Sequence, residues 1–159
     1  MISFGQSMKI CLKTKIFTLR DRAPRSEFWW FMLGAFLLNI ILGILNIVPI
    51  LGQLLCLIGG IWLVIASISV SVRRMHDLDK SGWWLLFPYL AFFVGLIVMA
   101  VGMALSSDIN GTAVAGFVII GVGMISVFVL WIMMIVRGTV GPNRFGPDPL
   151  AETTISKEG

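Results

Sequence analysis

Four long apolar runs dominate the pattern of hydrophobic and polar positions along the chain. They cover residues 28–48, 51–72, 83–105 and 113–136, and none of them contains Asp, Glu, Lys, Arg or His. Each run is long enough to cross the hydrocarbon core of a membrane, which is about 30 Å thick and needs a helix of about 20 residues. The pattern therefore predicts an all-α, polytopic membrane protein with four transmembrane helices.

The segments between the runs predict how these helices are connected. Residues 46–52 and 106–112 are short and carry no basic side chain, whereas residues 73–82 carry Arg73, Arg74 and Lys80. A short connection leaves adjacent spans no choice but to run antiparallel, so we expect two antiparallel hairpins. They form a transmembrane domain of residues 25–137, after a cytoplasmic N-terminal segment (1–24) and before a cytoplasmic tail rich in Gly and Pro (138–159), whose composition favours successive turns.

The distribution of charge predicts the orientation of the spans. All 12 Lys and Arg residues can be placed on one side of the membrane, and the positive-inside rule makes that side the cytoplasm, with both termini there. The chain is 58% hydrophobic and only 13% charged, so its net charge of +4 lies beside the bilayer rather than on a soluble domain. Anionic lipid headgroups are therefore the expected partners, and nucleic acid is not.

The N-terminal segment has helical spacing. Phe4, Met8, Leu12 and Ile16 recur every four residues, while basic side chains such as Lys13 fall mostly on the other side. This pattern predicts an amphipathic interfacial helix with its apolar face dipped into the bilayer. A partly disordered tail is the alternative.

Small residues predict where the spans pack. Lipid tails are as apolar as leucine, so close backbone approach at small side chains must hold membrane helices together. The third span offers Gly95, Gly102 and Ser106, and the fourth offers Gly116 and Gly123. We expect these stripes to pack the spans into a compact four-helix bundle.

Three polar motifs fall at the predicted cytoplasmic ends of the spans. They are R-S-E-F-W from Arg25, R-R-x-H-D-x-x-x-S-G-W-W from Arg73, and N-R-F-G-x-D-P from Asn143. With these motifs in this order, roughly residues 15 to 150 resemble the bacterial inner-membrane family catalogued as domain of unknown function 805. Asp21 stands where that family often has Gly, and Phe145 where Tyr is commoner. The resemblance implies a multi-pass location in the bacterial inner membrane and a fold, but no activity.

The motifs supply a set of candidate residues for one cytoplasmic site. Basic side chains from them can form a cationic ring that Glu27 and nearby aspartates partly neutralise. The ring is interpreted as a structural clasp, with a pocket for an anionic ligand and a catalytic site as alternatives. The candidate residues are Arg25, Glu27, Trp29, Arg73, Arg74, His76, Asp77, Lys80, Ser81, Trp83, Trp84, Asn143 and Arg144.

The sequence predicts no catalytic residue, no cofactor and no metal site. His76 and Asp77 are adjacent and do not face each other on a helix, and one His with scattered carboxylates falls short of a zinc site. The leading hypothesis is a non-enzymatic integral membrane protein whose basic and aromatic cytoplasmic face binds anionic lipid or a protein partner in the membrane. The alternatives are a small transporter or channel subunit, and a membrane enzyme acting on a lipid-linked substrate at the inner leaflet.

Overall fold

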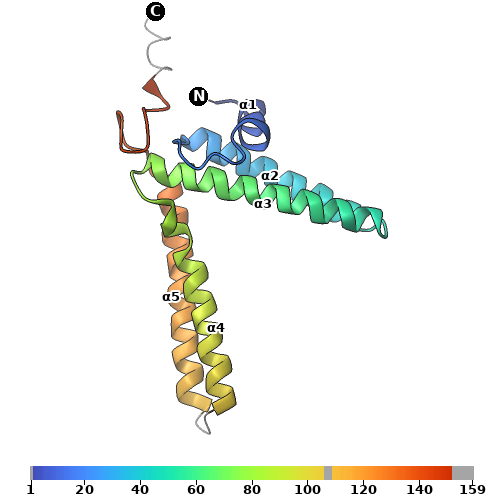
Figure 1. Ribbon diagram of the computed structural model, residues 1–159, viewed down its shortest axis with the longest axis vertical. Helices are drawn as coiled ribbons and strands as arrows, with labels where there is room; N and C mark the ends of the chain where they lie inside the picture. Colours follow the sequence, from blue (N-terminus) through green and yellow to red (C-terminus); the bar gives the residue numbers. More distant parts are fainter. Residues whose placement is uncertain (1, 106–108, 152–159) are drawn as a thin grey trace, which may run out of the picture. The chain divides into compact units, whose positions relative to one another are not determined.

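The computed structural model describes residues 2–105 and 109–151, and these residues form an all-α protein (Figure 1). The chain divides into two compact units, Met1–Ser81 with Arg137–Gly159, and Gly82–Val136. The first unit holds α1 (Phe4–Lys9), a π-helical turn η1 (Ile10–Thr14), α2 (Arg25–Leu45) and α3 (Leu51–Asp77). The second holds a 3-10 turn η2 (Gly82–Leu85), α4 (Phe87–Leu105) and α5 (Ile109–Ile135).

The four long helices match the four predicted spans. Each is long and apolar enough to cross a membrane, and large side chains such as Phe36 and Ile44 are more than 60% exposed on α2. Exposed apolar surface of this kind needs lipid rather than water around it. The prediction of four transmembrane helices in two antiparallel hairpins is confirmed, with α2 packed along α3 and α4 along α5.

The helix α3 is longer than the sequence pattern predicted. The apolar run ends at Val72, but the helix continues through the R-R-M-H-D segment to Asp77. At 1.5 Å per residue its 27 residues span about 40 Å, roughly 10 Å more than the hydrocarbon core. The last turns of α3 therefore carry the central motif out of the hydrocarbon as a helix rather than as a loop.

The N-terminal helix packs on the α2–α3 hairpin (Figure 1). A capping box at Ser3 and Gln6 starts α1, and the hydroxyl of Ser7 donates to the carbonyl of Glu27 at 2.6 Å. The helix is confirmed, but its contact face is centred on Ser7 and Cys11, which are fully buried, whereas Phe4 is 40% exposed. Larger side chains also contact the hairpin, since Met8 and Phe4 lie against α2 at Gly34 and Phe4 packs edge-on against Trp30.

The second unit is a hairpin of α4 and α5. Pro88 lies in the first turn of α4, where its missing N–H costs no helical hydrogen bond. A Cβ added at Gly95 would lie 3.0 Å from the carbonyl oxygen of Gly116, so the small-residue stripes do bring these backbones together. Ser106 lies outside the described residues, and packing of one hairpin against the other stays a prediction.

Candidate functional site

Buried charges gather at the end of the α2–α3 hairpin where α2 begins and α3 ends. One group, the Glu27 cluster, consists of Ser7, Cys11, Glu27 and Arg73. A second group, the Asp77 cluster, consists of Arg22, Arg74, Asp77 and Thr139. All but one of these residues are buried, the exception being Thr139.

The Glu27 cluster ties the N-terminal helix to both long helices. The guanidinium of Arg73 pairs with the carboxylate of Glu27, and both side chains are at most 4% exposed. The thiol of Cys11 lies 3.6 Å from both groups and donates to Glu27. Burial, followed by the charge of Glu27, raises the pKa of the Cys11 thiol to about 11. The thiol is therefore neutral at physiological pH and acts as a hydrogen-bond donor rather than as a nucleophile.

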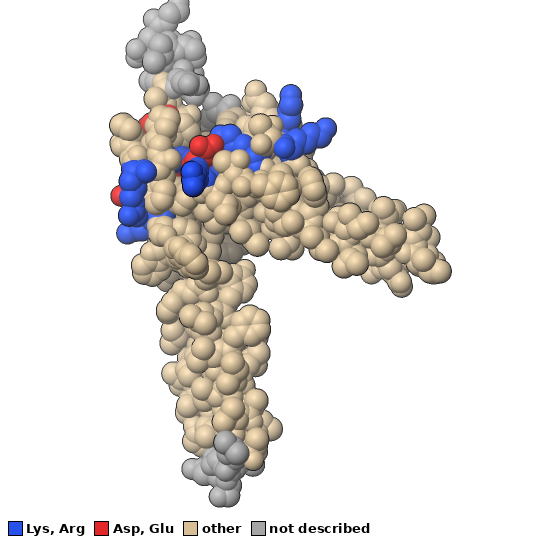
Figure 2. Space-filling view, viewed as in Figure 1, with Lys and Arg blue, Asp and Glu red and all other residues tan. Residues whose placement is uncertain are grey.

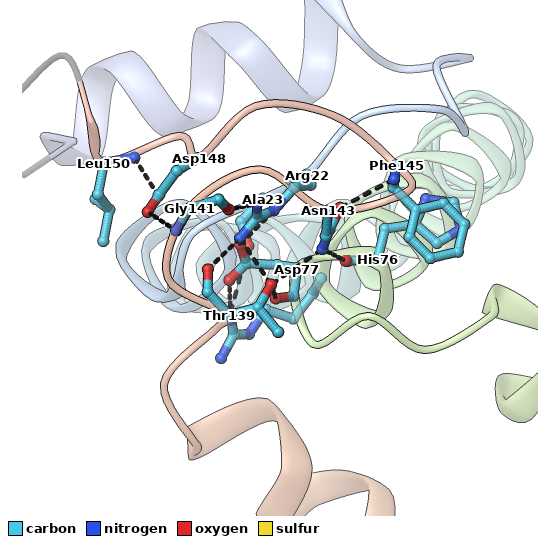
Figure 3. Close-up of polar contacts among 11 residues, drawn as sticks. Arg22, Ala23, His76, Asp77, Thr139, Gly141, Asn143, Phe145, Asp148 and Leu150 are labelled. Atoms are coloured by element: carbon cyan, nitrogen blue, oxygen red, sulfur yellow. Dashed lines mark hydrogen bonds and ion pairs between the residues drawn. The ribbon is translucent and has the colours of Figure 1, made fainter.

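The Asp77 cluster joins three segments that are far apart in the sequence (Figure 3). Asp77 accepts from Nε of Arg22 at 3.1 Å and also pairs with Arg74 one turn back on α3. The remaining nitrogens of Arg22 reach the tail, where they donate to the carbonyls of Thr139 at 2.5 Å and Gly141 at 2.6 Å. Arg22 therefore uses its whole fork to hold the tail against the end of α3.

The tail also caps the C-terminus of α3. Lys80 and Asp79 donate their backbone N–H groups to the carbonyls of Met75 and His76, as in a Schellman motif. The tail adds the N–H of Thr139 to the carbonyl of Asp77 at 2.8 Å. The carbonyls that a helix end leaves without partners are therefore satisfied partly by the local turn and partly by a segment about 60 residues further along the chain.

The segment after Gly141 forms a compact turn, as the Gly- and Pro-rich composition predicted. Asn143 and Gly146 exchange two backbone hydrogen bonds, at 3.0 and 3.1 Å. The carboxylate of Asp148 accepts from the N–H groups of Leu150 at 2.9 Å and Gly141 at 3.0 Å, and these two bonds lower its pKa. Hydrogen bonds among its own residues therefore stabilise the turn, independently of its contacts with the rest of the protein.

An aromatic contact adds to the polar ones. The rings of His76 and Phe145 stack at 3.8 Å between centroids and 4° between planes, and the guanidinium carbon of Arg144 lies 4.7 Å from the centroid of the Phe145 ring. Beside this stack, the side chain of Asn143 donates to the carbonyl of His76 at 2.9 Å (Figure 3). The contact uses the face of the Phe145 ring and needs no hydroxyl group on it.

Close packing around Asp77 imposes glycine at one tail position. A Cβ added at Gly138 would overlap the carboxylate of Asp77. Position 138 must therefore have no side chain, so that the carboxylate of Asp77 can keep its ion pairs with Arg22 and Arg74.

The structure brings some of the predicted site residues together and leaves others apart. Glu27 pairs with Arg73, Arg74 with Asp77, and exposed Arg144 with Asp79 at 3.1 Å. His76 contacts the tail turn, through the ring of Phe145 and the side chain of Asn143. The other predicted residues belong to neither cluster. Arg25 and Lys80 are exposed, Ser81 is half-buried, and Trp29 packs edge-on against Phe28. Trp83 and Trp84 are exposed and lie in the second unit.

Sequence reasoning missed Arg22, Cys11 and Thr139. Arg22 stands among other basic residues before the first span, and no local pattern distinguishes it from them, because its partners Thr139 and Gly141 lie far away in the sequence. Cys11 and Thr139 carry no charge, and nothing in their neighbourhood marks them. Among the described residues, no three His, Cys, Asp or Glu side chains come together in a way that would hold a metal ion.

Comparison with known proteins places this arrangement in a family. The chain is 31% identical over 140 residues to the inner membrane protein YhaH of Escherichia coli K12, an alignment that covers 84% of this chain and 88% of YhaH. It is 29% identical over 133 residues to the inner membrane protein YhaI of the same strain, covering 80% and 82% of the two chains. No solved structure matches the chain. The family described as "Protein of unknown function (DUF805)" matches residues 16–147, so this inner-membrane chain, with its four spans, belongs to that family.

Proposed function

We propose that the protein is a non-enzymatic integral membrane protein that binds anionic lipid headgroups at the charged end of its first unit. The observation that carries the proposal is that some basic side chains are buried in ion pairs whereas others are exposed. Arg22, Arg73 and Arg74 are buried and paired with carboxylates, so they hold the fold. Lys9, Lys13, Arg20 and Lys80 are exposed, and we call this set the basic face.

The basic face lies at the level where a membrane presents its headgroups. Figure 2 shows the charged side chains of the first unit gathered near α1 and the tail, while the far part of the α2–α3 hairpin shows only uncharged residues. A basic residue beside an anionic surface contributes about 1 kcal/mol of attraction. The positive-inside rule would put this end at the inner leaflet, with both termini cytoplasmic.

The chemistry of His76 and Asp77 supports binding over catalysis. Asp77 already accepts from two arginines, so it is poorly suited to orient a histidine or take a proton. His76 is 8% exposed and stacked on Phe145, which leaves little room for a substrate. A transporter is supported even less, because ionisable side chains usually mark its path and those of the first unit are concentrated at one end.

Native mass spectrometry of the protein in mild detergent tests the proposal. The unaltered protein should retain phosphatidylglycerol in preference to phosphatidylcholine. Replacing Lys9, Lys13 and Arg20 together by Gln removes three charges, and we expect the number of phosphatidylglycerol molecules retained in excess of phosphatidylcholine to fall. The matched control, with Lys9 and Lys13 replaced by Arg, keeps the charge and should keep the preference. Equal retention of the two lipids by the unaltered protein would count against lipid binding.

A further inference from the structure

A small cavity lies between the start of α2, the end of α3 and the tail. It measures about 20 Å³, which is room for one water molecule or one oxygen atom of a larger group. Pro24 and Arg25 form one wall, Asp77 the second, and Arg137 and Thr139 the third. All of these residues belong to the first unit.

The charges around the cavity favour an anion. Its two acidic groups are already engaged, since Asp77 is paired with Arg22 and Arg74. The carboxylate of Asp148 accepts from two backbone N–H groups. Arg25 and Arg137 line the cavity itself. Arg22 and Arg74 do not line it, but they pair with Asp77, so four arginines balance two aspartates in this region.

The position of the cavity suggests which anion would reach it. Arg25 is the first residue of α2, and Asp77 is the last residue of α3, so the cavity lies where two spans leave the hydrocarbon. Arg25 and Arg137 are both exposed and can therefore reach a group at the mouth. Phosphate groups of phospholipids occupy this level of a bilayer, and arginine binds phosphate oxygens with two parallel N–H groups.

We propose that Arg25 and Arg137 form a binding site for a phosphodiester anion, with one phosphate oxygen entering the cavity and the rest of the headgroup at its mouth. The proposal rests on the lipid-binding function above and names the subsite within it. A phospholipid is the expected source, and a soluble glycerophosphate shares the same chemistry. The basic face attracts the headgroup region in general, whereas this pair of arginines selects the phosphate.

The test uses native mass spectrometry to compare two variants, each of which loses two positive charges. Arg25→Gln with Arg137→Gln should weaken retention of the most tightly held phosphatidylglycerol about tenfold, because two charge-assisted contacts are lost. Lys9→Gln with Lys13→Gln removes the same charge from the basic face and should leave that tightest lipid in place while reducing the number of weaker ones. The melting temperature of each variant is measured in the same detergent, so that lipid retention is compared only between folded proteins.

The outcomes separate the site from the general function. If phosphatidylglycerol is preferred but the arginine pair can be removed without effect, the site is wrong and lipid binding stands. If no lipid is preferred while glycerophosphate binds in a manner that needs both arginines, the anion site stands and its source is soluble. If neither lipid nor glycerophosphate responds to the two arginines, the phosphodiester site is overturned.

Discussion

Arg22 and Asp77 are 55 positions apart in the sequence, and their side chains meet at 3.1 Å inside the protein. The pair joins the segment before the first span to the last residue of the second, and the same arginine reaches the carbonyls of Thr139 and Gly141 in the tail. Three segments therefore depend on one carboxylate. A cluster of this kind stabilises a particular arrangement only while all of its partners are present.

Replacing Asp77 by Asn should destabilise the protein strongly. The change leaves two buried guanidinium groups, those of Arg22 and Arg74, without their carboxylate. Breaking a buried ion pair from one side costs about 3–5 kcal/mol. We expect a clear fall in the melting temperature of the protein in detergent, followed by tryptophan fluorescence.

The matched control for Asp77→Asn is Asp79→Asn. Asp79 also pairs with an arginine, Arg144, but both side chains are about half exposed, and such pairs contribute only about 0–1 kcal/mol. Asn also tolerates the left-handed backbone of position 79, where φ is 55°. Equal effects of the two substitutions would mean that burial at Asp77 does not matter, contrary to the structure.

The spans were predictable because hydrocarbon imposes a simple rule on sequence. Length and lack of charge place four helices, and their ends lie within a few residues of those observed, except at Asp77. There the apolar run stops at Val72 but the helix does not, since Arg and Met are good helix formers and the tail supplies partners for the last carbonyls. A rule based on hydrophobicity has no means of detecting such a cap.

The sequence predicted where the charged residues lie better than it predicted which of them form ion pairs. Glu27 near the start of an apolar span calls for a cation, and the two arginines after the second span are the obvious source. The role of Arg22 depends instead on where the tail returns in space, which no local pattern encodes. Uncharged members such as Cys11 follow from packing alone.

Replacing Phe145 by Ala should loosen the tail. The substitution removes the ring that stacks on His76 at 3.8 Å and that Arg144 contacts from 4.7 Å. Local opening depends on how few contacts hold a segment, so trypsin should cleave after Arg144 about fivefold faster, as measured by mass spectrometry of digests. Phe145→Tyr keeps the ring face and should be cleaved at the original rate. Faster cleavage of the Tyr variant as well would show that the stack does not hold the tail.

The buried thiol predicts a loss of stability at high pH. The Cys11 pKa is raised from 9.0 to about 11 in the folded protein, so between these values the unfolded chain releases a proton that the folded protein keeps. The protonated thiol therefore adds its full contribution to the free energy of unfolding below pH 9, and this contribution is lost as the pH rises toward 11. At about pH 10.5 the loss is about 2 kcal/mol. Between pH 8 and about pH 10.5 the melting temperature should fall further in the unaltered protein than in Cys11→Ser, whose hydroxyl does not ionise. Parallel falls would contradict a buried, protonated thiol.

The predicted orientation of the spans places positions 47 and 80 on opposite sides of the membrane, so cysteines there should differ in their reaction with an impermeant reagent. Cationic side chains are costly to carry across a bilayer, which should keep Lys80 on the cytoplasmic side and the short turn between α2 and α3 outside. In a Cys11→Ser, Cys56→Ser background, a cysteine replacing Ile47, which is 80% exposed in that turn, should react with a membrane-impermeant maleimide in intact spheroplasts. A cysteine replacing exposed Lys80 should react only after the membrane is permeabilised. Labelling of the Lys80 position without permeabilisation would reverse the topology and with it the assignment of the basic face and the arginine pair to the inner leaflet.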